Sequence, residues 1–175
     1  MVSCAQVIDA RGQRVIENAC GVDAAGAGGT QSSWQALKQE LLGATSRISI
    51  QIRDYASRVC QFYPQDFTPG CTLEVRRFQR DLPQYRDRNA QILGISADDT
   101  ASHDDFCDSE GLKFPLLADT DGRVSKAYGS WLGARSLRHS FIIDPQGIVR
   151  SHFVGVNPAV HSQEVLDRLD ELQRA

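Results

Sequence analysis

Short apolar runs alternate with amphipathic stretches over the last two thirds of the chain. Apolar residues recur at helical spacing after Cys71, and this pattern predicts a helix that weakens near Pro83. Further helices are predicted over 101–110, 123–128 and the last 16 residues, and strands over 91–96, 115–119, 140–144 and 148–154. The last two strands flank a Pro-Gln-Gly turn signal. This order of elements predicts a single α/β domain with a mixed central sheet flanked by helices.

The first 60 residues have a less regular pattern. A hairpin is expected over 7–16, a Gly/Ala-rich loop over 21–30, a helix over 33–42 and a strand over 47–52. Residues 56–61 precede an aromatic pair, but Arg58 and Gln61 are unfavourable in a buried central strand, which normally reads as a continuous apolar run.

Composition narrows the function classes. The chain has 175 residues, with 19 Lys and Arg against 22 Asp and Glu, so its net charge of −3 offers no basic excess for nucleic acid or a membrane surface. No apolar run is long enough for a transmembrane helix, and no signal peptide is recognised. Five irregularly spaced cysteines favour a cytoplasmic protein with reactive thiols over a disulfide framework.

One cysteine lies at a predicted helix start. Thr68 suits the N-cap, where its hydroxyl can accept a backbone N–H bond, and Pro69 suits the first helical position. Cys71 then falls in the first turn, where the helix dipole favours negative charge and the thiol should ionise more easily than a free one. A buried structural cysteine is the alternative interpretation.

The residues FYPQDFTPGCTLE around Cys71 resemble the active-site motif of peroxiredoxins, and the TPGCT portion resembles the peroxiredoxin Q, or bacterioferritin comigratory protein, subfamily. The resemblance implies a thioredoxin-like fold and covers the chain from about Phe62 to the C-terminus. Residues 61–175 are therefore predicted to form the peroxiredoxin domain. Residues 1–60 are predicted to be a divergent segment, or the product of a shifted reading frame or a wrong start.

The resemblance assigns roles in peroxide reduction. Cys71 is implied to be the peroxidatic nucleophile, with Thr68 bonding the sulfur and the peroxide and Pro64 shielding the thiolate from water. Backbone N–H groups at Gly70 and Cys71 could meet the developing negative charge, as in an oxyanion hole.

A distant cation completes the implied site. Arg138, just before the strand that starts at residue 140, matches the active-site arginine of the family, and Arg135 is a weaker candidate. Glu74 could bind the arginine or stabilise the end of the helix. Alternatively, it is an acidic residue of the first turn that points into solvent.

The subfamily also implies a resolving cysteine. Position 76 is Arg, so a resolving thiol five residues after Cys71 is excluded, and Cys107 matches the alternative place, 36 residues downstream. Cys107 could instead pack inside its helix. His103 and Cys107 share a helix face, but without a second pair of ligands a metal site is not expected.

The predicted function is a thiol peroxidase that reduces hydrogen peroxide and organic hydroperoxides and is recycled by thioredoxin or a similar dithiol. No metal, haem or flavin cofactor is implied, and a monomer is expected from the subfamily. The alternative is a redox-sensing or interaction protein on the same fold with weak turnover. A thioredoxin-like reductase is disfavoured because the sequence has no C-x-x-C.

Overall fold

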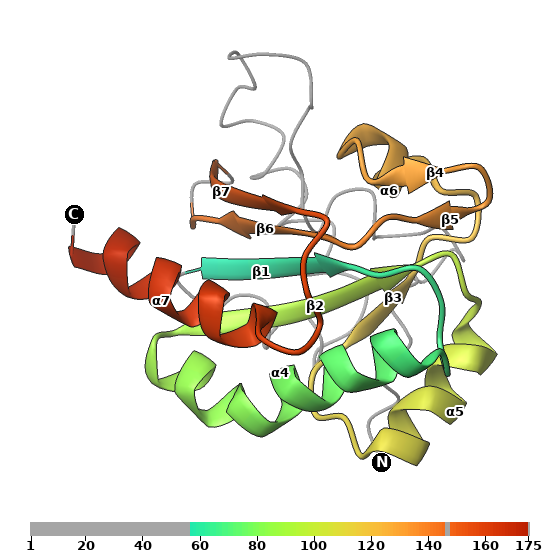
Figure 1. Ribbon diagram of the computed structural model, residues 1–175, viewed down its shortest axis with the longest axis horizontal. Coiled ribbons are helices and arrows are strands. Elements are labelled where there is room, and N and C mark those ends of the chain that lie inside the picture. Colours follow the sequence, from blue (N-terminus) through green and yellow to red (C-terminus); the bar gives the residue numbers. More distant parts are fainter. Residues whose placement is uncertain (1–56, 146–147, 175) are drawn as a thin grey trace, which may run out of the picture.

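A computed structural model describes residues 57–145 and 148–174. Figure 1 shows its central sheet, whose strands are β1 (Ser57–Phe62), β2 (Ala90–Ser96), β3 (Leu116–Ala118), β6 (His139–Ile143) and β7 (Val149–Val154). The helices are α4 (Pro69–Asp87), α5 (Thr100–Glu110), α6 (Arg123–Ala127) and α7 (His161–Arg174). A separate two-stranded ribbon joins β4 (Trp131–Leu132) to β5 (Arg135–Ser136), and the sequence pattern did not predict it.

The sheet is mixed and has the order β3-β2-β1-β6-β7. Strands β1, β2 and β3 are parallel, whereas β6 runs antiparallel to β1 and β7 runs antiparallel to β6. The helices α4 and α5 form the crossovers between the parallel strands, as parallel connections require. The prediction of an α/β domain with a mixed sheet is confirmed.

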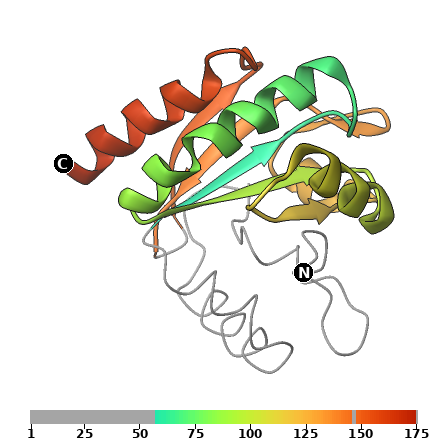
Figure 2. The ribbon, with the colours of Figure 1, turned by 90° about the horizontal axis from the view of Figure 1, so that it is seen from below.

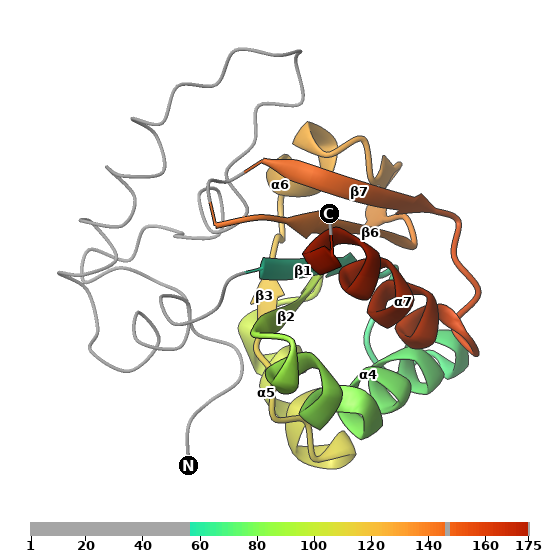
Figure 3. The ribbon, with the colours of Figure 1, turned by 90° about the vertical axis from the view of Figure 1, so that its left-hand side faces the viewer.

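Helices cover the sheet unequally. Figures 2 and 3 show α4, α5 and α7 gathered on one face, with α6 on the other. An apolar core on the first face joins β1 and β2 to these three helices through residues such as Val59, Phe78, Phe106 and Leu166. A smaller core, with Phe62 and Leu93, faces α6. Burial of these side chains is the main force that holds the layers together.

The central strand differs from the sequence expectation. Residues 57–62 form β1, in the middle of the sheet, although Arg58 and Gln61 are both buried there. Burial lowers the pKa of Arg58 to about 10, and the Asp144 carboxylate opposes this effect. Asp144 follows Ile143, which pairs with Arg58 in the register of β1 with β6. An acid just after the end of the neighbouring strand therefore makes a buried arginine in the central strand tolerable.

The helix after Cys71 also differs from the prediction. It continues through Pro83 to Asp87 instead of weakening at the proline. Pro83 lies on the exposed side, whereas Leu82 and Tyr85 on either side of it are buried. The Tyr85 hydroxyl also donates to the Ser162 carbonyl on α7 at 2.8 Å. Packing against α7 thus outweighs the loss of one helical hydrogen bond.

The other described elements agree with the sequence pattern. The strand and helix positions after residue 90 match to within a few residues, and Gly111 ends α5 in the left-handed conformation, with φ 62°. The elements predicted for residues 7–52, and residues 1–56 of the predicted N-terminal segment, lie outside the described residues. Within the described ranges, every helix is too short or too polar to span a bilayer.

Gly94 on β2 packs closely against Leu116 on β3. A Cβ at this position would lie 2.4 Å from Cδ2 of Leu116, a side chain that is fully buried in the core. We expect Gly94→Ala to lower the free energy of unfolding by about 1–3 kcal/mol through overpacking. Urea denaturation measures this change, and Leu116→Val in the same chain should recover part of it. A loss that the second substitution does not reduce would contradict this cause.

Candidate active site

The carboxyl end of β1 leads directly to Cys71. The chain leaves β1 at Phe62, runs through the loop of residues 63–68 and enters α4 at Pro69. Thr68 is the N-cap, with extended φ and ψ of −81° and 144°, and its carbonyl accepts the first helical bond from Thr72 at 2.9 Å. Cys71 is therefore the third helical residue, as predicted, and its side chain is fully buried. A thiolate there faces the positive end of the helix dipole.

Arg138 supplies a positive charge at the sulfur. Its Nη2 donates to Cys71 Sγ at 3.3 Å, across 67 residues of sequence. Arg138 immediately precedes β6, and the first residue of β6, His139, pairs with Phe62 at the end of β1. The antiparallel pairing of β1 with β6 therefore delivers the arginine to the start of α4.

Gly70 makes room for this contact. A Cβ on Gly70 would lie 3.2 Å from Arg138 Nη2, which is tighter than an ordinary van der Waals contact. Glycine at the second helical position thus lets the guanidinium approach the helix start, where the first backbone N–H groups have no helical acceptor. Arg135, the weaker candidate, is exposed in β5, so the structure brings Arg138 and not Arg135 to the thiol.

Glu74 holds Arg138 from one turn further along α4. Its Oε2 accepts a short charge-assisted bond from Arg138 Nη1, and the Glu74 side chain is almost completely buried. Burial raises the pKa of Glu74 to about 7, even though Arg138 acts in the opposite direction. Burial likewise opposes the charge of Arg138, but Glu74 and Cys71 outweigh it and raise the pKa of Arg138. Of the interpretations for Glu74, the structure supports the arginine partner.

Two polar side chains beneath this ion pair have atoms without partners. Oε1 of Glu74 and both amide atoms of Gln61 are buried and have no hydrogen-bond partner within the described part of the chain. Gln61 is nevertheless near enough to Glu74 to lower the pKa of that carboxyl slightly, a small effect against that of burial. The unmet hydrogen-bonding capacity of Glu74 is a second reason why its carboxylate form is unfavourable here.

The roles predicted for Thr68 and Pro64 have different outcomes. The Thr68 hydroxyl does not cap the helix; it donates to the Gln65 carbonyl at 2.9 Å. Because a hydroxyl has one proton, it cannot also donate to the sulfur in this arrangement, although it can still accept. Pro64 lies in the loop between β1 and α4, half-buried, and its predicted shielding of the thiolate stays a prediction.

Cys107 lies on α5, in the same apolar core as Cys71. Both thiols are buried and reduced. Cys107 is one turn after His103, whose ring bonds the loop in front of Cys71 rather than a metal. In the described residues, no group of three or more His, Cys, Asp or Glu side chains could hold a metal ion.

The sequence interpretation missed Asp66 and its partners. Asp66 lies in the loop between β1 and α4, is buried, and accepts from Tyr63, Ser102 and His103, each at 2.7 Å. A buried carboxylate with three donors is a structural centre, but the pattern YPQD reads only as a polar turn. The adjacent Ser102 and His103 at the start of a predicted helix were the available signal.

The raised pKa of Glu74 makes stability depend on pH. Its folded value of about 7, against an ordinary 4.5, means that the folded protein binds more protons than the unfolded chain between these values. The free energy of unfolding should therefore fall as the pH rises through this window. We expect a loss of the order of 3 kcal/mol that Glu74→Gln does not show.

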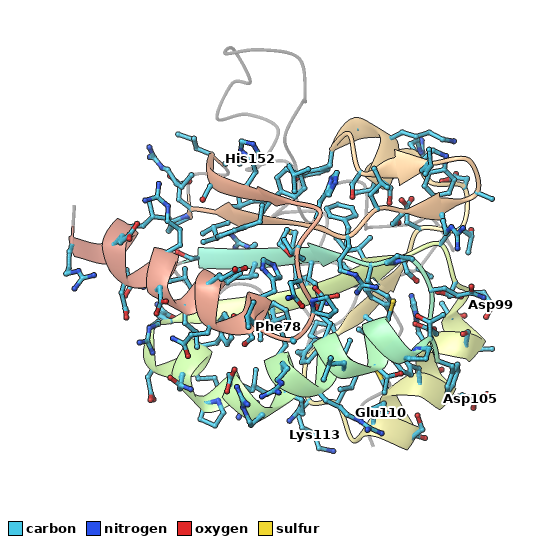
Figure 4. All side chains as sticks on the ribbon, in the orientation of Figure 1. Phe78, Asp99, Asp105, Glu110, Lys113 and His152 are labelled. Atoms are coloured by element: carbon cyan, nitrogen blue, oxygen red, sulfur yellow. The ribbon has the colours of Figure 1, made fainter. Side chains whose placement is uncertain are left out.

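Urea midpoints at about pH 5 and about pH 8 measure the effect. The control is Asp105→Asn, on the exposed side of α5, where Asp105 is labelled in Figure 4. The control should keep the pH dependence of the wild type. Parallel profiles for wild type and Glu74→Gln would contradict the assignment.

Comparisons with known proteins agree with this geometry. A model of the AhpC/TSA family matches residues 36–152. The chain is 36% identical over 132 residues to a putative peroxiredoxin bcp of Helicobacter pylori, covering 70% of this chain and 87% of the relative. It is 38% identical over 119 residues to peroxiredoxin Bcp of Xanthomonas campestris, covering 63% and 74%.

Solved structures give the same result. The bacterioferritin comigratory protein of Xanthomonas campestris, studied for its alkyl peroxide reduction activity, superposes with a TM-score of 0.66 at 32% identity, over 70% of this chain and 83% of that chain. Peroxidoxin BcpB of Mycobacterium tuberculosis gives a TM-score of 0.67 at 26% identity, over 74% and 88%. The predicted thioredoxin-like fold is thereby confirmed, and the chain belongs to the AhpC/TSA family as a peroxiredoxin, a thiol peroxidase.

Proposed function

We propose that Cys71 is the peroxidatic nucleophile and Cys107 the resolving thiol of a peroxidase that reduces hydrogen peroxide and organic hydroperoxides and is recycled by thioredoxin or a similar dithiol. The observation that supports it best is the contact of 3.3 Å between Cys71 Sγ and Arg138 Nη2 at the start of α4. A buried thiol that touches a guanidinium is poised to react as a thiolate.

The first step is a displacement on oxygen. The Cys71 thiolate attacks one peroxide oxygen, an S–O bond forms and the O–O bond breaks. The leaving hydroxide or alkoxide takes up a proton and departs as water or alcohol, so that Cys71 becomes a sulfenic acid. Negative charge moves from sulfur to oxygen in this step. We assign Arg138, which contacts the sulfur, and the N–H groups of Gly70 and Cys71 as the donors that meet that charge.

The second step closes a disulfide. The Cys107 sulfur attacks the Cys71 sulfenic acid, an S–S bond forms and water leaves. Disulfide formation needs the two Cα atoms within about 7 Å, so helices that hold the thiols apart must open locally. Two serine-for-cysteine variants of the Xanthomonas relative have been solved, at positions 36 residues apart. Cys107 follows Cys71 at the same spacing.

The electron donor is proposed by chemical class. A dithiol such as thioredoxin attacks the disulfide and returns both cysteines to thiols. A Drosophila relative named thioredoxin-dependent peroxide reductase is 34% identical over 131 residues, covering 69% of this chain and 56% of that relative. An NADPH-coupled assay with thioredoxin and its reductase tests this donor. Oxidation without turnover would instead favour the redox-sensing role.

Replacement of each thiol separates the two steps. Cys71→Ser should abolish peroxide consumption, because an alcohol has almost no anion near neutral pH. Cys107→Ser should keep the first turnover but lose recycling by thioredoxin, and Cys71 should then overoxidise to sulfinic acid. Mass spectrometry of alkylated protein after one equivalent of peroxide measures both outcomes. A wild-type disulfide from Cys71 to Cys60, Cys20 or Cys4, or only dimers, would exclude Cys107 as the resolving residue.

Loss of the guanidinium should slow the first step. Arg138→Ala removes the donor on the sulfur and leaves Glu74 buried without its partner. We expect the second-order rate with peroxide to fall by about 10²–10³, as for removal of one oxyanion donor. Stopped-flow kinetics measure the rate, and melting temperatures show that the variant is folded. Arg135→Ala, on the exposed ribbon strand β5, should stay within about twofold of wild type, and an equal loss in both variants would refute the assignment.

A further inference from the structure

A buried cluster joins the loop in front of Cys71 to α5. Asp66 accepts from the hydroxyls of Tyr63 and Ser102 and from Nδ1 of His103, each at 2.7 Å, and its backbone N–H donates to Asp98 Oδ2 at 2.9 Å. We call these five residues the Asp66 clasp. Asp66, Tyr63 and His103 are all at least nine-tenths buried.

The clasp connects the two segments that carry the reactive thiols. Asp66 is five residues before Cys71, and His103 is four residues before Cys107, one helical turn away. Figure 4 labels Asp99 and Glu110, which mark the two ends of α5. If the Cys107 sulfur is to reach Cys71, the backbone around His103 must move, and the bonds from His103 and Ser102 to Asp66 must break.

The clasp is a buried polar connection between these segments, beside the ring contact of Phe67 with Phe106. A carboxyl group with three donors, shielded from water, loses more on opening than an exposed pair does. The exposed ion pair of Arg76 on α4 with Glu110 on α5 links nearby positions, but solvent screens it. Burial and the Asp66 carboxylate raise the pKa of Tyr63 well above its ordinary value, so the phenol remains a donor.

The imidazole of His103 is fully buried and bonds Asp66 through one of its two ring nitrogens. Asp66 accepts at Nδ1, so that nitrogen carries the proton, while Nε2 is buried without a hydrogen-bond partner in the described part of the chain. The ring is therefore fixed to the loop in front of Cys71 through the bond from Nδ1 to Asp66.

We propose that Asp66 and His103 are positioning residues, and that the strength of the Asp66 clasp sets how oxidised Cys71 is divided between disulfide formation and overoxidation. While the clasp is closed, the sulfenic acid stays in the peroxide-reactive site. A second peroxide can then oxidise it to sulfinic acid, with alcohol or water as the other product. When the clasp opens, α5 can unwind and Cys107 can displace water from the sulfenic acid. The inference rests on the proposed resolving role of Cys107.

The test compares variants of the full chain under the same peroxide pulse. Asp66→Asn keeps the size of the side chain but replaces a carboxylate oxygen by an amide N–H₂ group. This group cannot accept from the three donors around it, so the clasp is weakened. We expect disulfide formation to become about three- to tenfold faster. The peroxide concentration that overoxidises half of Cys71 should rise by the same factor. Acid-quenched mass spectrometry measures both quantities, and the ratio of sulfinic acid to disulfide is compared with that of Arg76→Ala, which loses a contact to the same helix outside the clasp.

Two further variants keep the test decisive. Ser102→Ala removes a single donor to Asp66 and should shift the ratio in the same direction by a smaller factor, even if Asp66→Asn fails to fold. Arg76→Ala breaks the exposed ion pair to the same helix and should stay within about twofold of wild type. A wild-type ratio in Asp66→Asn and Ser102→Ala, with a normal Cys71–Cys107 disulfide, would overturn the clasp. Absence of that disulfide from wild type would overturn the role of Cys107 and the inference with it.

Discussion

The site depends on one half-buried guanidinium shared by two acidic groups. Arg138 bonds Cys71 through Nη2 and Glu74 through Nη1, so one positive charge faces both a thiol and a carboxyl group. If both were ionised, the buried site would hold a net negative charge, which a low dielectric disfavours. Burial raises the pKa of Glu74 to about 7, so near neutral pH this carboxyl is partly protonated, and its neutral form leaves more of the guanidinium charge for the sulfur.

The sheet, and not the helix, fixes where that guanidinium lies. Arg138 is outside regular structure, but the residue after it pairs with Phe62 in the register of β1 with β6. The Val156 N–H also donates to the Arg138 carbonyl at 3.1 Å. A shift of this register by one residue would turn every side chain of β6 to the opposite face of the sheet. The same backbone pairing thus builds the core and aligns the charge with Cys71, and Gly70 leaves the space for it.

The sequence predicted the elements better than it predicted the polar contacts. Cys71 in the first turn of α4 could be read from Thr68 and Pro69, because capping is local physics. Arg138 could be chosen only through the family resemblance, since no local rule tells one loop arginine from another. The Thr68 hydroxyl donates to the Gln65 carbonyl instead of accepting from a backbone N–H of the helix. A hydroxyl near a helix start can bond either kind of backbone group, and the sequence does not tell which one it will bond.

The errors have a common physical cause, which is tertiary packing that outweighs local preference. Pro83 did not end α4, because residues close to the proline in α4 are held against α7, for example by the bond from Tyr85 to Ser162. Gln61 was not excluded from the central strand because one face of β1 runs beneath the polar active site, near Glu74. Strand rules that assume two apolar faces fail where one face supports a charged site.

The two helices that carry the free thiols are held to the rest of the fold to different extents. Helix α4 has 19 residues and is tied to α7 by the Ser162 hydroxyl, which donates to Asp81 at 2.8 Å, as well as by Tyr85. Helix α5 has 11 residues, buries three side chains and ends at a left-handed glycine. Because α5 is shorter and buries fewer side chains than α4, it has less packing to lose on local opening. Cys71 therefore lies on the more firmly packed of these two helices, and Cys107 lies on the less firmly packed one.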